Sequence, residues 1–213
     1  MPQAYVRPGT TEHAVNGHYE IERLWRSAFC SYTKDHKSIE AWLELVERGP
    51  DEALKAASKF IEARVMPDAI TLGFSPQVLI GALALREHLT VVTSPEVERG
   101  LGPASLSKRA LDIYADRVEL VIAPFAPSPQ LGPEEVLRKL ADALSNLRAK
   151  GIRVLDISGG TQLVPIAAIK AGFDELSYAY PDGEKLIFYG PIIPVRKDVS
   201  HEVRRVHPGE SHS

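Results

Sequence analysis

Residues Ile152 to Ala171 read IRVLDISGGTQLVPIAAIKA, and this stretch decides the fold. It opens with a short apolar run rich in β-branched residues, which is typical of a strand buried on both faces. Ser158-Gly159-Gly160-Thr161 then predicts a turn, and the apolar residues after it recur at helical spacing. Pro165 fits the first turn of that helix, because the N–H that proline lacks would have no partner within the helix there. The predicted order is therefore strand, glycine turn, helix.

This turn has two interpretations. Gly159 and Gly160 allow the backbone to pass close to a ligand, and the free N–H groups at the start of the following helix carry partial positive charge. Such a turn favours a phosphate or another anion. Alternatively, the two glycines form a tight connection between strand and helix with no ligand.

Strands and helices alternate along the chain from Asp68. Strands are predicted at 69–72, 89–93, 118–123 and 152–157, with helical patterns at 76–85, 105–115 and about 133–150. Residues 175–180 and 185–189 flank Asp182-Gly183, a strong signal for a β-hairpin. The pattern predicts an α/β fold with a Rossmann-like, mostly parallel sheet, helices on both faces and a C-terminal β-hairpin.

The sequence predicts three parts. Residues 1–67 form a small N-terminal helical extension, residues 68–194 form the main domain, and residues 195–213 form a solvated tail. Three short amphipathic helices are expected, at 20–29, from a cap at Ser38 to about 48, and at 51–65. Such a trio can resemble a DNA reader, but residues 1–67 hold nine Lys and Arg against ten Asp and Glu. Direct DNA binding is therefore not expected, and these helices are predicted to pack against the main domain or a second subunit.

Composition sets further bounds on the function. The 213 residues have a net charge of -3, which disfavours a protein that coats nucleic acid non-specifically. Cys30 is the single cysteine, and no Cys/His cluster has metal-ligand spacing, so we expect no disulfide, no metal and no cofactor. No apolar run has the length of a membrane span, and the first residues do not read as a signal peptide. We therefore expect a cytoplasmic protein that does not bind membranes.

A second candidate site element is Gly73-Phe74-Ser75-Pro76, at the end of the first strand of the main domain. The Ser75 hydroxyl can donate to a phosphate or ribose oxygen, or it can simply cap a helix that begins at Pro76. Neither glycine loop has the G-x-G-x-x-G or G-x-x-x-x-G-K-[ST] pattern, which disfavours NAD and ATP hydrolysis. Both loops follow the carboxyl ends of parallel strands, where ligands bind in such sheets.

Together these two loops make residues 68–194 resemble the CRISPR-associated Rossmann fold (CARF) domain, which has a Ser or Thr loop after the first strand and a late Gly-Gly-Thr turn. The resemblance implies a homodimer that binds a cyclic oligoadenylate, usually the four-adenylate ring, across its two-fold axis in type III CRISPR antiviral defence. One patch used twice would then contact a symmetric ring twice. The ligand-binding residues it implies are Gly73, Phe74, Ser75, Ser158, Gly159, Gly160, Thr161 and Gln162.

Relatives without an effector domain often resemble ring nucleases, which cut the ring without a metal by attack of a ribose 2′-hydroxyl on the neighbouring phosphorus. The catalytic positions implied here are Ser75 and Gln162. Many ring-cleaving relatives have Lys or Arg directly after the threonine, so Gln162 departs from their pattern. Lys170 lies about two helical turns further on and is expected to be too distant. Lys108, Arg109 and Arg153 are other possible cations, with a solvated helix face or a sheet edge as the alternative.

Two further functions stay open. The chain could hold the ring without cutting it and signal through the N-terminal helices. It could also be a Rossmann-like enzyme for another nucleotide.

Overall fold

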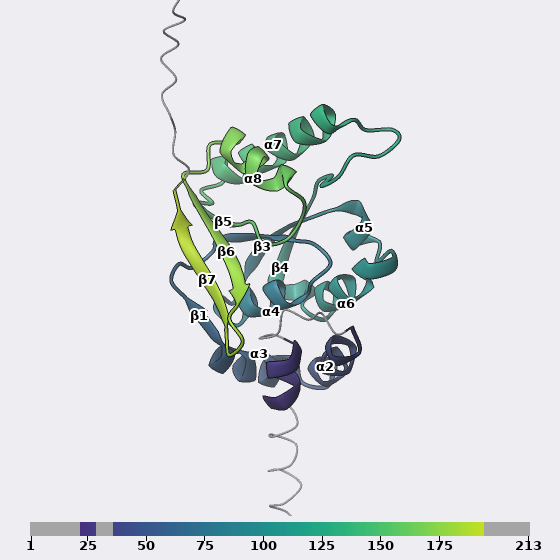
Figure 1. The fold of residues 1–213 in the computed structure, drawn as a ribbon, viewed down its shortest axis with the longest axis vertical. Coiled ribbons are helices and arrows are strands. Elements are labelled where there is room, and N and C mark those ends of the chain that lie inside the picture. Colours follow the sequence, from purple (N-terminus) through teal and green to yellow (C-terminus); the bar gives the residue numbers. More distant parts are fainter. Residues whose placement is uncertain (1–21, 29–35, 194–213) are drawn as a thin grey trace, which may run out of the picture.

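The computed structural model describes residues 22–28 and 36–193 and has an α/β fold (Figure 1). A seven-stranded sheet has the order β1-β7-β6-β5-β2-β3-β4, and every neighbouring pair is parallel except the antiparallel hairpin β6-β7. The Rossmann-like sheet with a C-terminal hairpin that the sequence predicts is confirmed. The strands are β1 (Ile61–Ala63), β2 (Ala69–Leu72), β3 (Leu89–Thr93), β4 (Val118–Ile122), β5 (Val154–Asp156), β6 (Glu175–Pro181) and β7 (Leu186–Ile192).

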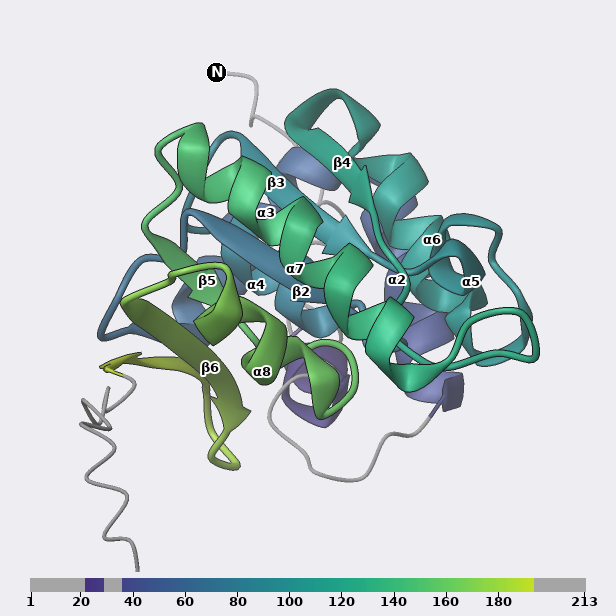
Figure 2. The ribbon, with the colours of Figure 1, turned by 90° about the horizontal axis from the view of Figure 1, so that it is seen from above.

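Helices cover both faces of the sheet. A core that includes Val92, Leu155 and Phe173 packs beneath α7 and α8, which lie across one face (Figure 2). A second core, under the opposite face, includes Ile70, Leu72 and residues from the N-terminal helices. Besides a helix over 22–28, the helices are α2 (His36–Arg48), α3 (Pro50–Ala57), α4 (Gln77–Leu83), α5 (Pro95–Glu98), α6 (Ser105–Ile113), α7 (Pro133–Ala149) and α8 (Leu163–Lys170).

The order of the strands creates a switch point between β2 and β5. The chain runs outward from β2 to β3 and β4, then crosses back through α7 to β5 on the other side of β2. The helices α4 and α8 that follow β2 and β5 consequently leave toward opposite faces. In sheets of this type, ligands bind in the crevice that opens at such a point, beyond the carboxyl ends of the strands.

The prediction of a third helix through residues 51–65 is wrong at its C-terminal end. α3 ends at Ala57, a 3₁₀ turn follows at Ser58–Phe60, and Ile61–Ala63 form β1 at the edge of the sheet. β1 pairs with β7, with Ile61 opposite Leu186. Local helical periodicity is a weak preference, and backbone pairing with a strand far along the chain outweighs it. Ser38, predicted as a cap, lies inside α2, which begins at His36 in the described residues.

The N-terminal helices share the core of the sheet domain. Trp42, Leu43 and Val46 of α2 are fully buried, and the Trp25 and Trp42 rings meet edge to face with centroids 4.8 Å apart. Arg109 of α6 pairs with Glu47 of α2, with Nη2 and Oε2 2.6 Å apart. Apolar burial of this kind stabilises by about 25 cal/mol per Å², far more than an exposed ion pair contributes. α2 is therefore attached to the sheet domain mainly through its buried apolar face.

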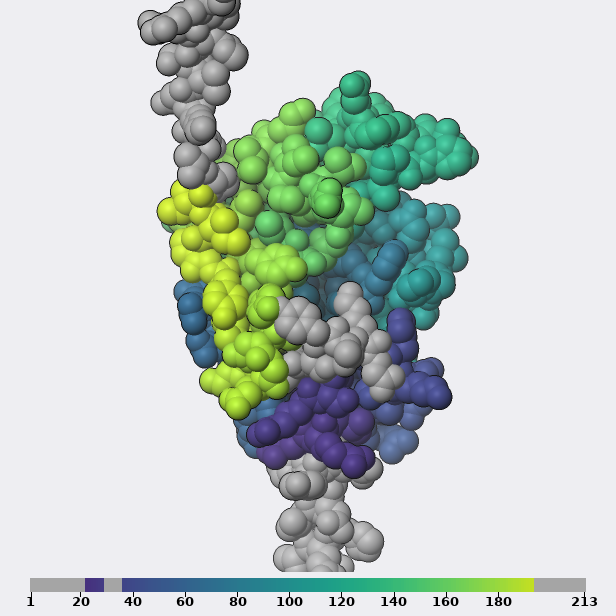
Figure 3. All heavy atoms as spheres, viewed as in Figure 1, coloured from purple at the N-terminus to yellow at the C-terminus, as the bar shows by residue number. Residues whose placement is uncertain are grey.

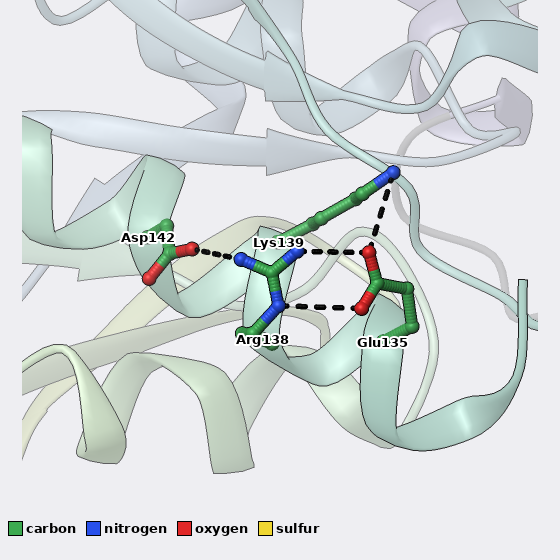
Figure 4. Close-up of polar contacts among 4 residues, drawn as sticks. All are labelled: Glu135, Arg138, Lys139 and Asp142. Carbon is green, nitrogen blue, oxygen red and sulfur yellow. Dashed lines mark hydrogen bonds and ion pairs between the residues drawn. The ribbon is translucent and has the colours of Figure 1, made fainter.

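The outer surfaces of α7 and α8 differ in chemistry. On α7, Arg138 bonds to Glu135 at 2.8 Å and to Asp142 at 3.0 Å, while Lys139 lies 3.5 Å from Glu135 (Figure 4). α8 by contrast is apolar nearly all round. Throughout the described ranges, no helix combines the length and the apolar character that crossing a bilayer requires.

Candidate functional site

A cavity of about 360 Å³ opens at the switch point, beyond the carboxyl ends of four parallel strands. Its walls come from the loops after β2, β3, β4 and β5, so segments far apart in the sequence converge there. Both glycine loops predicted from the sequence contribute. The lining residues are Gly73, Phe74, Ser75, Val78, Ser94, Glu96, Phe125, Ala126, Ser158, Gly159, Gly160 and Thr161.

The loops after β2 and β5 touch each other through their backbones. A Cβ atom added to Gly159 would lie 2.1 Å from the Thr71 carbonyl oxygen and 2.6 Å from the Gly73 nitrogen. A Cβ on Gly73 would lie 3.0 Å from the Gly160 nitrogen. Gly160 itself has a φ of +112°, which side chains rarely adopt. The close approach of two backbones therefore requires these glycines, and the loops that meet there also line the cavity.

Four consecutive amides in this turn have no acceptor. Within the described residues, the N–H groups of Gly159, Gly160, Thr161 and Gln162 donate no hydrogen bond. The turn leads directly into α8, whose first turn adds the partial positive charge of a helix N-terminus. Successive free amides at the start of a helix form a concave site for an anion.

The buried carboxyl of Asp156 fixes the start of this turn. The Ser158 N–H donates to its Oδ1 at 3.0 Å, and the Ser177 hydroxyl donates to its Oδ2 at 2.9 Å. The Ser158 hydroxyl in turn accepts from the Ala179 N–H at 2.5 Å. Burial raises the pKa of Asp156 to about 6, although the bonds from Ser158 and Ser177 oppose that rise. Asp156 was not predicted from the sequence, where its signal is a carboxyl at the end of an apolar strand.

Thr161 joins the turn to the loop after β4. Its hydroxyl donates a short hydrogen bond to the Phe125 carbonyl and accepts from the Leu163 N–H at 3.3 Å. That hydroxyl is thus engaged within the protein, and the part of Thr161 left for a ligand is its N–H. Phe125, a wall of the cavity that the sequence analysis did not select, is positioned by this bond.

The loop after β2 presents its side chains to the cavity. Phe74 is 53% exposed although it is aromatic, and Ser75 is half-buried. No hydrogen bond of the Ser75 hydroxyl exists among the described residues. The alternative that Ser75 caps a helix is wrong, because α4 begins at Gln77 with Pro76 at its N-cap position and no side-chain capping bond. The Ser75 hydroxyl is therefore free to bind a ligand.

Charged residues are nearly absent from the lining. Of the lining residues in the described chain, Glu96 alone carries a charge. Lys108 forms an ion pair with Asp112, and Arg109 forms one with Glu47, on the solvated face of α6. Neither cation is among the residues that line the cavity. Arg153 is exposed at the start of β5, away from these loops.

Gln162 is exposed at the N-cap position of α8 and is not among the lining residues. No group of three or more His, Cys, Asp and Glu side chains in the described ranges is arranged to hold a metal ion. No protein-family model matches the sequence, and no curated protein matches it.

Proposed function

We propose that this chain binds a cyclic oligoadenylate, with the four-adenylate ring as the expected form, as part of a type III CRISPR response. The observation that carries the proposal is the run of four amides from Gly159 to Gln162, unpaired among the described residues, beside a cavity at the switch point. The resemblance of the two glycine loops to the CARF domain adds the identity of the anion.

Each wall of the cavity suits a different part of a nucleotide. A phosphate accepts from the amides of the Gly159-Gly160 turn and lies near the positive end of α8. The exposed ring of Phe74 can stack on a base, and the Ser75 hydroxyl can donate to a phosphate or ribose oxygen. Asp156 supports these contacts by holding Ser158 in place.

We propose that two copies of the chain share the ring. The cavity of about 360 Å³ is at the small end of the range of about 300–1,000 Å³ for small-ligand sites, so a four-nucleotide ring needs more room than one copy offers. Ile166 and Ile169 on α8 are each 47% exposed, on a helix that is apolar nearly all round. α8 and the β6-β7 hairpin lie on the same side of the molecule (Figure 3). A helix of that kind is normally buried, and a second copy would cover it.

Binding without rapid cutting is favoured by the composition of the cavity. In ring cleavage the 2′-oxygen forms a bond to phosphorus while the bond from phosphorus to the 5′-oxygen breaks, and cations stabilise the charge that develops. The described lining offers Ser75 but no cation. Cleavage with Ser75 and Gln162 in the catalytic positions is thus proposed only as a slow activity.

A sensor that acts through the N-terminal helices is the second candidate. Gln77, at the start of α4 and two residues after Ser75, donates from Nε2 to the Ala28 carbonyl at 3.1 Å. This bond connects the loop after β2 to the helix over 22–28. A ligand that moves the loop would change this contact.

Titration calorimetry with cyclic tetra-adenylate tests binding, and chromatography of the ring after incubation in a chelator tests cleavage. Ser75→Ala should weaken binding about 10- to 100-fold, as expected for one lost hydrogen bond in each of the two copies, without lowering thermal stability. Ser145→Ala, at an exposed position on α7, is the matched control. If no ring binds and a mononucleotide raises the melting temperature, the chain is a Rossmann-like protein for another nucleotide.

A further inference from the structure

Glu96 is a carboxylate in a cavity built for an anion. It lies in α5, just beyond the end of β3, and is the one charged residue among the described lining. Its backbone is held in place, because the Leu101 N–H donates to the Glu96 carbonyl at 2.9 Å. The preceding Ser94 accepts from the Val97 N–H at 3.5 Å and caps the same turn. Glu96 is exposed and lines the cavity from a turn whose backbone is fixed.

The side chain of Glu96 has no partner of its own. Within the described residues it makes neither an ion pair nor a hydrogen bond. An ionised carboxylate can only accept hydrogen bonds, so the group it suits must be a donor. Close to a phosphate the same carboxylate repels the ligand, and a donor on the ligand would offset that repulsion.

The position of Glu96 indicates which donor this is. In dinucleotide-binding sheets, an acidic residue about 20 residues after the first strand-to-helix turn accepts from a ribose hydroxyl. Glu96 follows Gly73 by 23 residues (96 − 73) and comes after the strand next to β2. In a 3′–5′-linked ring, the 2′-hydroxyl is the one donor that each ribose retains. The 2′-hydroxyl is also the group by which proteins tell RNA from DNA.

We infer that Glu96 accepts a hydrogen bond from a ribose 2′-hydroxyl of the bound ring and makes the site select ribose over deoxyribose. This inference rests on the proposed function. Glu96 is then a specificity-determining residue. It repels every anionic ligand, and only a ligand that carries the 2′-hydroxyl donates a hydrogen bond that offsets this repulsion. It thus disfavours a deoxyribose ring more than it favours a ribose ring.

The test compares cyclic tetra-adenylate with its all-2′-deoxy counterpart by titration calorimetry at fixed ionic strength, using the full chain. The wild-type dimer should bind the ribose ring about 100- to 10,000-fold more tightly, which corresponds to one hydrogen bond to a charged acceptor in each of the two copies. Glu96→Ala should reduce this ratio to about 1- to 3-fold. Part of the change should be tighter binding of the deoxy ring than in the wild-type chain, because the repulsion is gone.

Glu98→Gln is the control, because Glu98 lies in the same helix but does not line the cavity. Glu96→Gln is a second variant that keeps the size of the side chain and should also bind the deoxy ring more tightly. If the Glu96 variants keep the wild-type ratio, or if Glu98→Gln changes it equally, the inference is overturned while ring binding stands. If the wild-type chain binds neither ring, the proposed function fails and the inference fails with it.

Discussion

Replacing Asp156 by Asn tests whether this buried carboxyl makes the stability of the fold depend on pH. Asp156 is fully buried and accepts from Ser158 and Ser177. Asn can keep both contacts, because its Oδ1 accepts from the Ser158 N–H and its amide donates to the Ser177 hydroxyl. The substitution therefore removes the charge while leaving the geometry of the turn in place.

The expected magnitude follows from the raised pKa. Burial raises the pKa of Asp156 from 3.8 to about 6. As the pH rises from about 4 to 6, the unfolded chain loses this proton first and the folded chain must later bury a charge. The folded state of the wild-type chain is consequently destabilised across that interval by up to about 3 kcal/mol, at about 1.4 kcal/mol per pH unit. Below pH 4 and above pH 6 this contribution is constant.

Urea unfolding of both chains at several pH values from 4 to 7.5 measures this effect. The free energy of unfolding of Asp156→Asn minus that of the wild-type chain should increase by about 3 kcal/mol between pH 4 and pH 7. Asp182→Asn is a control of opposite sign, because bonds from the Lys185 and Glu184 N–H groups lower the pKa of that exposed carboxyl. Stability from Asp182 is present at neutral pH and lost as the pH falls. A difference for Asp156→Asn that stays constant with pH would refute the reasoning.

Three further predictions address the turn, the second copy and the N-terminal region. Gly159→Ala forces a Cβ against the backbone of β2, so we expect about 1–3 kcal/mol less stability by urea unfolding and loss of ring binding. Gly132→Ala is the control, since a Cβ there meets no atom within 4 Å. Ile169→Glu should yield monomers by light scattering, whereas Lys139→Glu on the charged face of α7 should not. Deletion of residues 1–67 removes β1 and a fully buried part of the core, so the remainder should show no cooperative unfolding by circular dichroism.

The strands of the sheet could be predicted because their residues carry the signal locally. β2, β3 and β5 are buried throughout and read as apolar, β-branched runs bounded by polar or glycine residues. The hairpin turn is equally local. Asp182 accepts from the N–H groups of Glu184 and Lys185, and Gly183 has a φ of +99°. Short-range chemistry decides these elements, so a single sequence reveals them.

β1 could not be predicted, because its cause lies elsewhere in the chain. Ile61–Ala63 continue a helical pattern, and their strand geometry depends on pairing with β7, more than 120 residues later. The residues of the site also divide into those with a local signal in the sequence and those whose role depends on distant segments. The meeting of the loops after β2 and β5 was expected from the rule on the carboxyl ends of parallel strands. Asp156 and Glu96 were missed, since each has its role only through neighbours brought together by the fold.

The structure also changes how the two interpretations of Gly159-Gly160 relate to each other. From the sequence alone, a tight connection and a ligand site were two alternative interpretations of these glycines. The backbone of Gly159 approaches β2 so closely that no side chain fits, and in the part of the chain that the structure describes the amides from Gly159 to Gln162 have no acceptor. Unpaired amides are costly when water is excluded and favourable when an anion accepts from them. The close packing that explains the glycines is therefore also what leaves amides available for a ligand.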